Sequence, residues 1–254
     1  LADYIANKYG RVISKGDTLR EITFDTALPS FTSNGAQVSV KIPKNGSDML
    51  INPSIKVVVS ALTQSGGTYK RLCDAFPIFL HQRFELWSNG ALIDTCYPEN
   101  LDSNLISHND NDEYTVLKKQ CGIDSTANRA TAAASAQTFF VPLKEMFSIF
   151  SQPCPMDIID DLELRVYFGR GSVGALVQCD GTNPALTLSD YKLVCNYVNP
   201  GQAVINFIRA KANEPQGFIV FDYVYMQKKT PVASSASTSQ TIQLPELNNK
   251  DLIY

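Results

Sequence analysis

The stretch LELRVYF, Leu162–Phe168, decides the fold class of this chain. Its apolar residues alternate with polar or aromatic ones, so that Leu, Leu, Val and Phe share one face of an extended backbone. Glu163, Arg165 and Tyr167 share the opposite face. A period of two predicts a β-strand with one buried face. Strand patterns of this kind recur along the chain in both directions from this stretch.

Several other segments predict strands. Ile55–Leu62 (IKVVVSAL) is almost continuously apolar and β-branched, which predicts a strand buried on both faces. Phe84–Trp87 and Ala91–Cys96 flank Ser88-Asn89-Gly90, and Asn-Gly between apolar runs predicts a tight hairpin. The remaining predicted strands are Leu19–Thr26, Gln37–Ile42, Lys192–Val198, Gly217–Lys228, Gln240–Leu244 and Asp251–Tyr254.

Predicted helices are few and short. Pro142–Phe150 gives the clearest pattern, because its apolar residues recur at helical spacing and Pro153 follows. Thr126–Ala136, rich in small residues, is predicted to be an exposed loop, although its alanines would permit a helix. Ser234–Ser239 is predicted to be a linker. The other predicted helices are Pro98–Ile106, Val116–Cys121 and, capped by Asn199, Pro200–Ala212. Strands without alternating helices favour an all-β antiparallel sandwich or barrel over a doubly wound α/β fold.

Composition excludes several classes of protein. The chain has 254 residues, is 44% hydrophobic and carries a formal net charge of −3. It can therefore bury a full core, and it lacks the Lys/Arg excess that neutralises nucleic-acid phosphates. No apolar run reaches the roughly 20 residues of a membrane helix, and Leu1-Ala2-Asp3-Tyr4 does not resemble a signal peptide. The first and last residues, Leu1 and Tyr254, are expected to be limits within a longer polypeptide.

The cysteines and histidines predict no catalytic or metal centre. The closest cysteines, Cys179 and Cys195, are too far apart for a C-x-x-C motif, so the six cysteines are expected to be scattered reduced thiols that serve as small buried hydrophobes. A disulfide framework is the minority alternative. His81 is expected to be a packed or surface residue of a strand. His108 borders the acidic run 109–113, which is better explained as a solvated loop than as a calcium site.

Two further motifs are weak. Gly169–Gly174 resembles half of a phosphate-binding loop but lacks the following Lys-Ser/Thr, so it is expected to join two strands. Asp157, Asp160 and Asp161 precede a strand and would form a glycosidase pair only by coincidence. The sequence therefore predicts no catalytic residue, no metal ligand, no cofactor and no enzymatic activity.

Three segments, in order, resemble the double jelly-roll major capsid proteins of icosahedral DNA viruses. This lineage includes adenoviruses, tectivirus-like phages, algal giant viruses and polinton-like viruses. The segments are Phe84–Ile106, with its Asn-Gly turn and "I-D" strand, Phe139–Phe168, with its aromatic-Pro-Leu run, and Leu188–Lys228, with its "D-Y-x-L" strand. Their order and spacing make the match specific, whereas each motif alone is loose.

The resemblance implies a fold and a division of the chain. It implies an N-terminal arm at residues 1–17 and a first jelly-roll barrel at 18–215, with an interbarrel helix near 200–212. Residues 216–254 would hold an interbarrel strand, a linker and the opening strands of a second barrel. Members of the family carry two barrels, so this chain is either truncated or a shorter relative.

The resemblance also implies a function. Family members form trimers of double barrels, which are pseudo-hexameric capsomers of an icosahedral shell. The implied partners are copies of the chain, other capsid proteins and an underlying viral membrane, without sequence-specific nucleic-acid binding. The implied location is the virion, after assembly inside the host cell. Jelly-roll loops can grow without disturbing the core, and the long segment Pro98–Gln137 fits that pattern.

Three alternatives remain open at the level of sequence. A carbohydrate-binding or adhesive β-sandwich would need a groove of exposed aromatic residues, and Trp87 is the single tryptophan. A cupin-like metalloenzyme would need clustered histidines, of which the chain has two in all. Within the capsid interpretation, a minor or vertex protein is the alternative to the major one.

Overall fold

The computed structural model describes residues 17–25, 27, 36–107, 111–159, 161–169 and 173–213. Residues 1–16 of the predicted arm at 1–17 lie outside these residues. So do the predicted strands Gly217–Lys228, Gln240–Leu244 and Asp251–Tyr254 and the predicted linker Ser234–Ser239. The division of the chain at residues 17 and 215 therefore stays a prediction.

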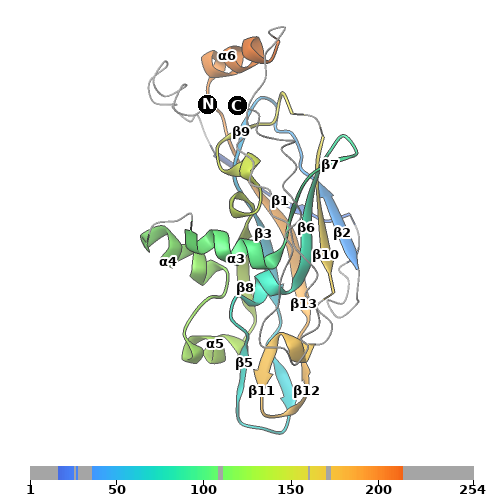
Figure 1. Cartoon of the computed structure of the whole chain (residues 1–254), viewed down its shortest axis with the longest axis vertical. Coiled ribbons are helices and arrows are strands. Elements are labelled where there is room, and N and C mark those ends of the chain that lie inside the picture. The colour runs from blue at the N-terminus through green and yellow to red at the C-terminus, as the bar shows by residue number, and fades with distance from the viewer. Residues whose placement is uncertain are drawn as a thin grey trace, which may run out of the picture.

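Two antiparallel sheets pack face to face and form the body of the molecule (Figure 1). Sheet A has the strand order β1-β13-β3-β8, with the short β9 paired to β3, and sheet B has the order β2-β10-β6-β7. The strands of sheet A are β1 Asp17–Thr23, β13 Leu188–Val198, β3 Met49–Val59, β8 Gln137–Pro142 and β9 Cys154–Pro155. The strands of sheet B are β2 Gln37–Lys41, β10 Leu162–Phe168, β6 His81–Ser88 and β7 Ala91–Cys96.

The strand pairing is that of one long hairpin rolled into a sandwich. The eight longer strands of the described chain pair first with last (β1 with β13), second with seventh (β2 with β10), third with sixth (β3 with β8) and fourth with fifth (β6 with β7). Rolling this hairpin adds the pairs β13 with β3 and β10 with β6. This connectivity is a jelly roll. The predicted all-β antiparallel jelly-roll sandwich with short inserted helices is confirmed.

The core lies between the two sheets. On β10 the burial alternates as the sequence predicts, with the four apolar residues of LELRVYF buried. The hairpin between β6 and β7 turns at Asn89 and Gly90, whose φ values of 47° and 79° are those of a type I′ turn. Phe84 and Leu86 on β6, Val38 and Val40 on β2, and Ile55, Val57, Leu193 and Tyr197 on sheet A complete the interior.

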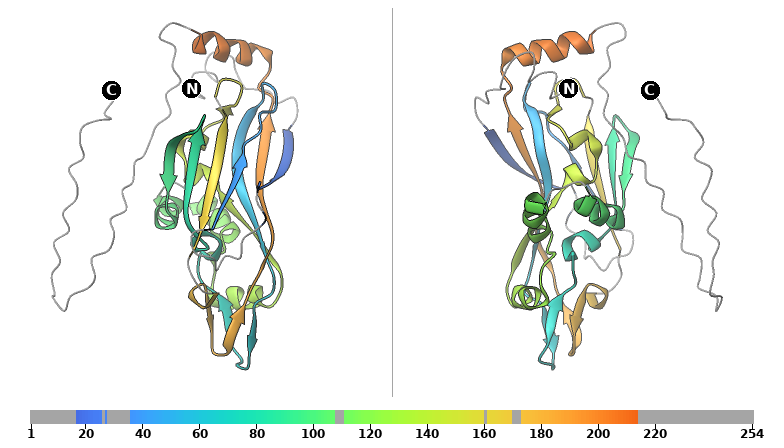
Figure 2. Two further views of the ribbon diagram at one scale, coloured as in Figure 1. Left: turned by 90° about the vertical axis from the view of Figure 1, so that its right-hand side faces the viewer. Right: turned by 60° about the vertical axis from the view of Figure 1, so that its left-hand side comes forward.

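Smaller elements extend both ends of the sandwich. Helix α6, Gln202–Ala212, lies across one end, and the two-stranded sheets β11-β5 and β12-β4 form the other (Figures 1 and 2). Helices α3 and α4 project from one side, in the connection between β7 and β8. None of the helices in the described chain combines the length and the apolar composition needed to cross a bilayer. The remaining bounds are β4 Thr63–Ser65, β5 Lys70–Leu72, β11 Val177–Cys179, β12 Thr182–Ala185, α2 Phe76–Phe79, α3 Pro98–Ser107, α4 Asn111–Gln120, α5 Thr126–Ala133, η1 Leu143–Glu145, η2 Ser148–Phe150 and η3 Val173–Ala175.

Two predictions about helices are wrong. Pro142–Phe150 is not one helix but two single 3₁₀ turns, η1 and η2, separated by Phe147 in an extended conformation with φ −130°. The apolar residues of the predicted helix face are buried all the same: Leu143 lies in η1, Phe150 lies in η2, and Met146 and Phe147 lie between the two turns. Thr126–Ala136 contains the helix α5 rather than an exposed loop, since Ser125 caps its N-terminus by accepting a hydrogen bond from Asn128 N.

Two other predictions need correction in detail. Strand β3 is fully buried on one face only, because Ser54, Lys56 and Val58 lie on the half-covered outer face of sheet A. Helix α6 begins at Gln202, after Gly201, and Asn199 does not cap it directly. Asn199 instead accepts a hydrogen bond from Gly201 N at 2.9 Å, which shapes the turn before the helix.

Candidate assembly surfaces

The outer face of sheet B carries an ordered lattice of charged and aromatic side chains. The register places Lys41, Glu163, Trp87 and Leu92 in one row across the four strands. The second row is Ser39, Arg165, Glu85 and Thr95, and the third contains Gln37, Tyr167 and Arg83. The polar positions of LELRVYF therefore form the middle strand of this lattice. The alternation in the sequence predicts which residues of β10 lie on this face. It does not predict which residues of the neighbouring strands pair with them.

Each arginine of the lattice covers an aromatic ring. The Arg83 guanidinium carbon lies 3.7 Å from the centroid of the Tyr167 ring, and that of Arg165 lies 4.0 Å from the centroid of Trp87. Such cation–π contacts favour Arg because its planar group stacks on the ring. Arg165 also donates to both carboxylate oxygens of Glu163, from Nε at 2.7 Å and Nη2 at 3.1 Å. Stacking and hydrogen bonding together hold these long side chains in one arrangement.

Glu85 is the centre of the lattice and is almost fully buried, with 7% of its surface exposed. Its carboxylate accepts hydrogen bonds from Arg83 Nε at 2.7 Å, Trp87 Nε1 at 3.0 Å and Tyr167 Oη at 2.9 Å. Burial opposes ionisation, but these three bonds and the Arg83 charge outweigh it and lower the pKa of Glu85. Glu85 is therefore an anion that ties β6 to β10.

The outer face of sheet A carries a closed ring of ion pairs. Lys56 lies 2.9 Å from Glu21 and 3.3 Å from Asp190, and Lys192 lies 3.1 Å from Glu21 and 3.3 Å from Asp190. The four residues come from β1, β3 and β13, so the ring crosses the centre of the sheet. Because the two lysines pair with the two carboxylates, this part of the face is locally neutral.

The free edge of sheet B is irregular. The pairing of β6 with β7 shifts between Leu86–Asp94 and Trp87–Leu92, so Ile93 is an extra, bulged residue. Leu92 is 50% and Ile93 39% exposed, whereas Asp94 is buried beside the bulge. Bulges and inward-pointing charges are devices that prevent uncontrolled strand addition at a sheet edge. The β7 edge is therefore protected against open-ended pairing.

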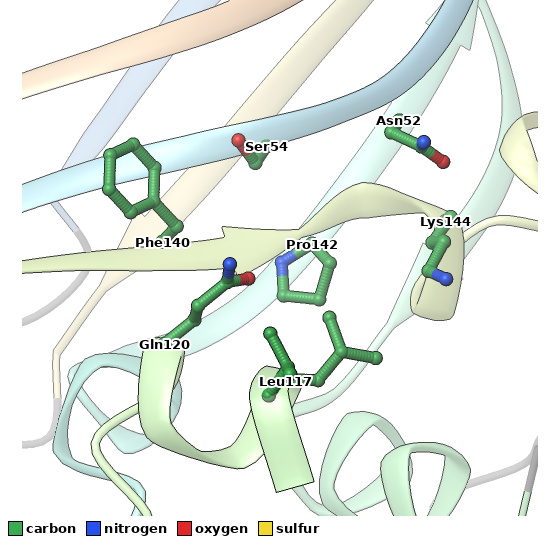
Figure 3. Close-up of a pocket in the computed structure, with 8 residues that line it drawn as sticks. Asn52, Ser54, Leu117, Gln120, Phe140, Pro142 and Lys144 are labelled. Carbon is green, nitrogen blue, oxygen red and sulfur yellow. The ribbon is translucent and has the colours of Figure 1, made fainter. Parts of the chain in front are cut away.

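A pocket of about 430 Å³ lies between α4 and the outer surface of β3 and β8 (Figure 3). Its apolar lining comes from Val116, Leu117, Phe140 and Pro142. Asn52, Ser54 and Gln120 add polar groups, and Lys144 is the one ionisable residue of the lining. Catalysis by general acids and bases or by a nucleophile needs several convergent reactive groups. The pocket does not assemble such a set.

His81 is a core residue rather than a surface one. It is fully buried between the sheets, where its Nε2 shares a 2.9 Å hydrogen bond with the Tyr191 hydroxyl. The rings of Phe84 and Phe168 lie 4.7 and 5.1 Å from the imidazole. Burial lowers the pKa of His81 to about 3, and hydrogen bonds with the backbone of Ile78 and Pro77 oppose this shift. The imidazole is therefore neutral and joins β6 to β13.

The remaining sequence candidates do not converge on a site. Asp157 pairs with Arg209 on α6, whereas Asp161 stands directly before β10. His108, Asp160 and residues 170–172 of the glycine-rich motif lie outside the described residues. Within the described chain, no three His, Cys, Asp or Glu residues form a group that could hold a metal ion.

All six cysteines are free thiols, and four of them are buried. Burial raises the pKa of Cys96 and Cys154 to about 12 and that of Cys195 to about 11. Cys73 and Cys179 are half-buried. The prediction of scattered reduced thiols is confirmed, and the disulfide framework is not formed.

Comparison with solved structures shows which proteins share this fold. The chain matches the PBCV-1 Vp54 capsid protein fitted into the virophage Sputnik, with a TM-score of 0.53 and 17% identity over 78% of this chain and 45% of that one. It matches the Faustovirus major capsid protein with a TM-score of 0.56 and 10% identity over 79% of this chain and 57% of that one. The match to the Sputnik virophage has a TM-score of 0.51 and 10% identity, over 74% and 48% of the two chains. No known family model and no curated protein sequence matches the chain.

These matches establish a class of fold. The chain has the jelly-roll architecture of viral major capsid proteins, as its three sequence segments predicted. It spans about half the length of the capsid proteins that it matches, 45% in the case of Vp54. At such low sequence identities the similarity shows the fold alone. The role of the chain is a proposal, which is argued from the fold and from the surfaces of the barrel.

Proposed function

We propose that this chain is a structural protein of an icosahedral viral capsid and supplies the first jelly roll of a double jelly-roll major capsid protein. The observation that carries the proposal is the rolled-hairpin strand order of a structure that matches a capsid protein over 78% of this chain. The role is structural rather than catalytic, and its location is the virion after assembly in the host cell.

The surfaces of the barrel support this role. A subunit that tiles into a shell needs sides that dock without large rearrangement, because ordering flexible side chains opposes association. The outer face of sheet B is already ordered by stacking and hydrogen bonding, and it presents the partly exposed guanidinium groups of Arg83 and Arg165. Arginine is enriched at interface hot spots. The bulged β7 edge disfavours uncontrolled aggregation. These features suit specific contacts between many copies.

The proposed assembly unit is a homotrimer whose six barrels form a pseudo-hexameric capsomer. It would contact neighbouring capsomers, other capsid proteins and an underlying viral membrane, without sequence-specific contacts to nucleic acid. In this arrangement a second barrel follows residue 215. Heterologous contacts between copies close into a ring when the rotation between neighbours permits it.

The mass of the native particle tests the proposal. The polypeptide encoded by the complete gene is purified and its mass is measured by light scattering coupled to size exclusion. Three times the mass of one polypeptide supports the proposal, and a monomer at high concentration with both barrels present contradicts it. The copy number in purified virions then separates a major capsid protein from a minor or vertex protein.

A carbohydrate-binding sandwich is not supported by the aromatic residues on the outer face of sheet B. Sugar rings stack on exposed aromatic faces, but the Trp87 ring is covered by Arg165 at 4.0 Å. Tyr167 is likewise covered by Arg83. The aromatic side chains of sheet B are therefore already engaged by protein groups.

A further inference from the structure

Helix α6 is attached to the end of the barrel by few apolar contacts. Val204 and Ile208 are buried against Met49, the first residue of β3, and Ile158, with Phe207 packed beside them. This cluster is separate from the main core between the sheets. An isolated helix of 11 residues is marginal in water, so α6 depends on its contacts with the barrel.

Arg209 connects α6 to two loops at once. Its Nε donates to Asp157 Oδ2 at 2.6 Å, in the loop between β9 and β10. Its Nη2 donates to Ser47 Oγ at 2.8 Å, in the loop between β2 and β3. The guanidinium fork can serve two acceptors in fixed directions, which the ammonium of a lysine does not. One side chain thus fixes the last turn of α6 relative to both sheets.

The start of the helix is fixed independently. Asn199 donates from Nδ2 to Asp48 Oδ1 at 2.9 Å and accepts from Gly201 N through Oδ1. Asp48 also accepts a bond from Asn45 Nδ2 at 2.6 Å, within the same loop as Ser47. Polar contacts therefore hold α6 at both ends, and the apolar cluster lies between them.

We propose that Arg209, Asp157 and Ser47 form a clamp that makes α6 and the jelly roll one rigid body. The barrel then sets the direction in which the chain continues after residue 213. The clamp controls orientation rather than global stability, because exposed ion pairs contribute little to the free energy of unfolding. If the chain has the capsid role proposed above, the clamp also fixes the placement of the second barrel; this consequence rests on that proposed function.

Hydrogen exchange followed by mass spectrometry tests the clamp on the purified full chain. Replacing Arg209→Gln removes both bonds, Arg209→Lys keeps the charge but not the fork, and Asp157→Asn removes the paired charge. We expect protection of the α6 amides to fall about tenfold in Arg209→Gln, and by less in the other two, with unchanged protection in β3 and β13. Asn206→Ala is the matched control, since Asn206 is exposed on α6 and its side chain bonds to Gln202 of the same helix.

The outcomes separate this proposal from that of a capsid function. Selective loss of protection in α6, absent in Asn206→Ala, supports the clamp. Equal protection of α6 in Arg209→Gln and the unchanged protein overturns it, as does a loss spread evenly over the barrel strands. The measurement does not require assembly, so a monomeric protein would contradict the capsid role while leaving the clamp testable.

Discussion

The buried His81 predicts a specific dependence of stability on pH. Its pKa in the folded chain is about 3, against 6.5 for an unperturbed histidine. Between these values the unfolded chain binds a proton that the folded chain does not, so stability is complete above pH 6.5 and is lost as the pH falls towards 3. Linkage gives a loss of about 1.4 kcal/mol at pH 5.5 and about 2.7 kcal/mol at pH 4.5 relative to pH 8. These are large fractions of the stability of a typical domain.

Urea denaturation at a series of pH values measures this effect against His81→Gln. Carboxylates titrate in both proteins and cancel in the difference. We expect the variant to be less stable at pH 8, because it loses packing against Phe84 and Phe168, but to lose less stability on acidification. Tyr191→Phe removes the hydroxyl that shares a hydrogen bond with His81 Nε2 and should keep the acid sensitivity of the original chain, because the imidazole stays buried. Parallel curves for the original protein and His81→Gln would refute the assignment of a neutral, buried imidazole.

Three further predictions concern the hairpin, the lattice and the thiols. Gly90→Ala should lower the free energy of unfolding by about 1 kcal/mol, because φ is 79° and the space around a Cβ is open, so that strain alone acts; an unchanged melting midpoint would contradict this. Arg165→Ala should expose the single tryptophan, Trp87, and raise acrylamide quenching of its fluorescence, whereas Lys44→Ala on an exposed loop should not. With a thiol reagent, two cysteines should react in the folded protein and four only after denaturation; rapid reaction of all six would show that the core is open. The reactive pair is Cys73 and Cys179, and the protected four are Cys96, Cys121, Cys154 and Cys195.

Local sequence patterns predict the elements whose residues interact mainly with their neighbours in the chain. LELRVYF predicts the two faces of β10, and Asn89-Gly90 predicts the hairpin, because period and turn geometry are properties of short segments. The same reasoning fails for Pro142–Phe150. There the apolar spacing fits one helix, but the core accepts the side chains from two separate turns on either side of the extended Phe147.

The surfaces are less accessible to such reasoning. Arg165 and Trp87 meet because β10 lies next to β6, which is a consequence of the rolled hairpin and not of either local sequence. The same holds for Arg209, which finds Asp157 and Ser47 on loops far away in the chain. The resemblance of three ordered segments supplied the architecture, whereas the ion pairs and stacked rings required coordinates.

The position of β13 has a consequence for synthesis of the chain on the ribosome. This strand inserts between β1 and β3, and Asp17 pairs with Val198, so the edges of β1 and β3 that face β13 stay open until Val198 has been translated. Contacts so distant in sequence slow folding and prolong the exposure of unpaired strands. Pairing of β3 with β8 covers only the other edge of β3, so the edge that β13 will occupy stays open and is a place where chaperones can act until β13 is complete.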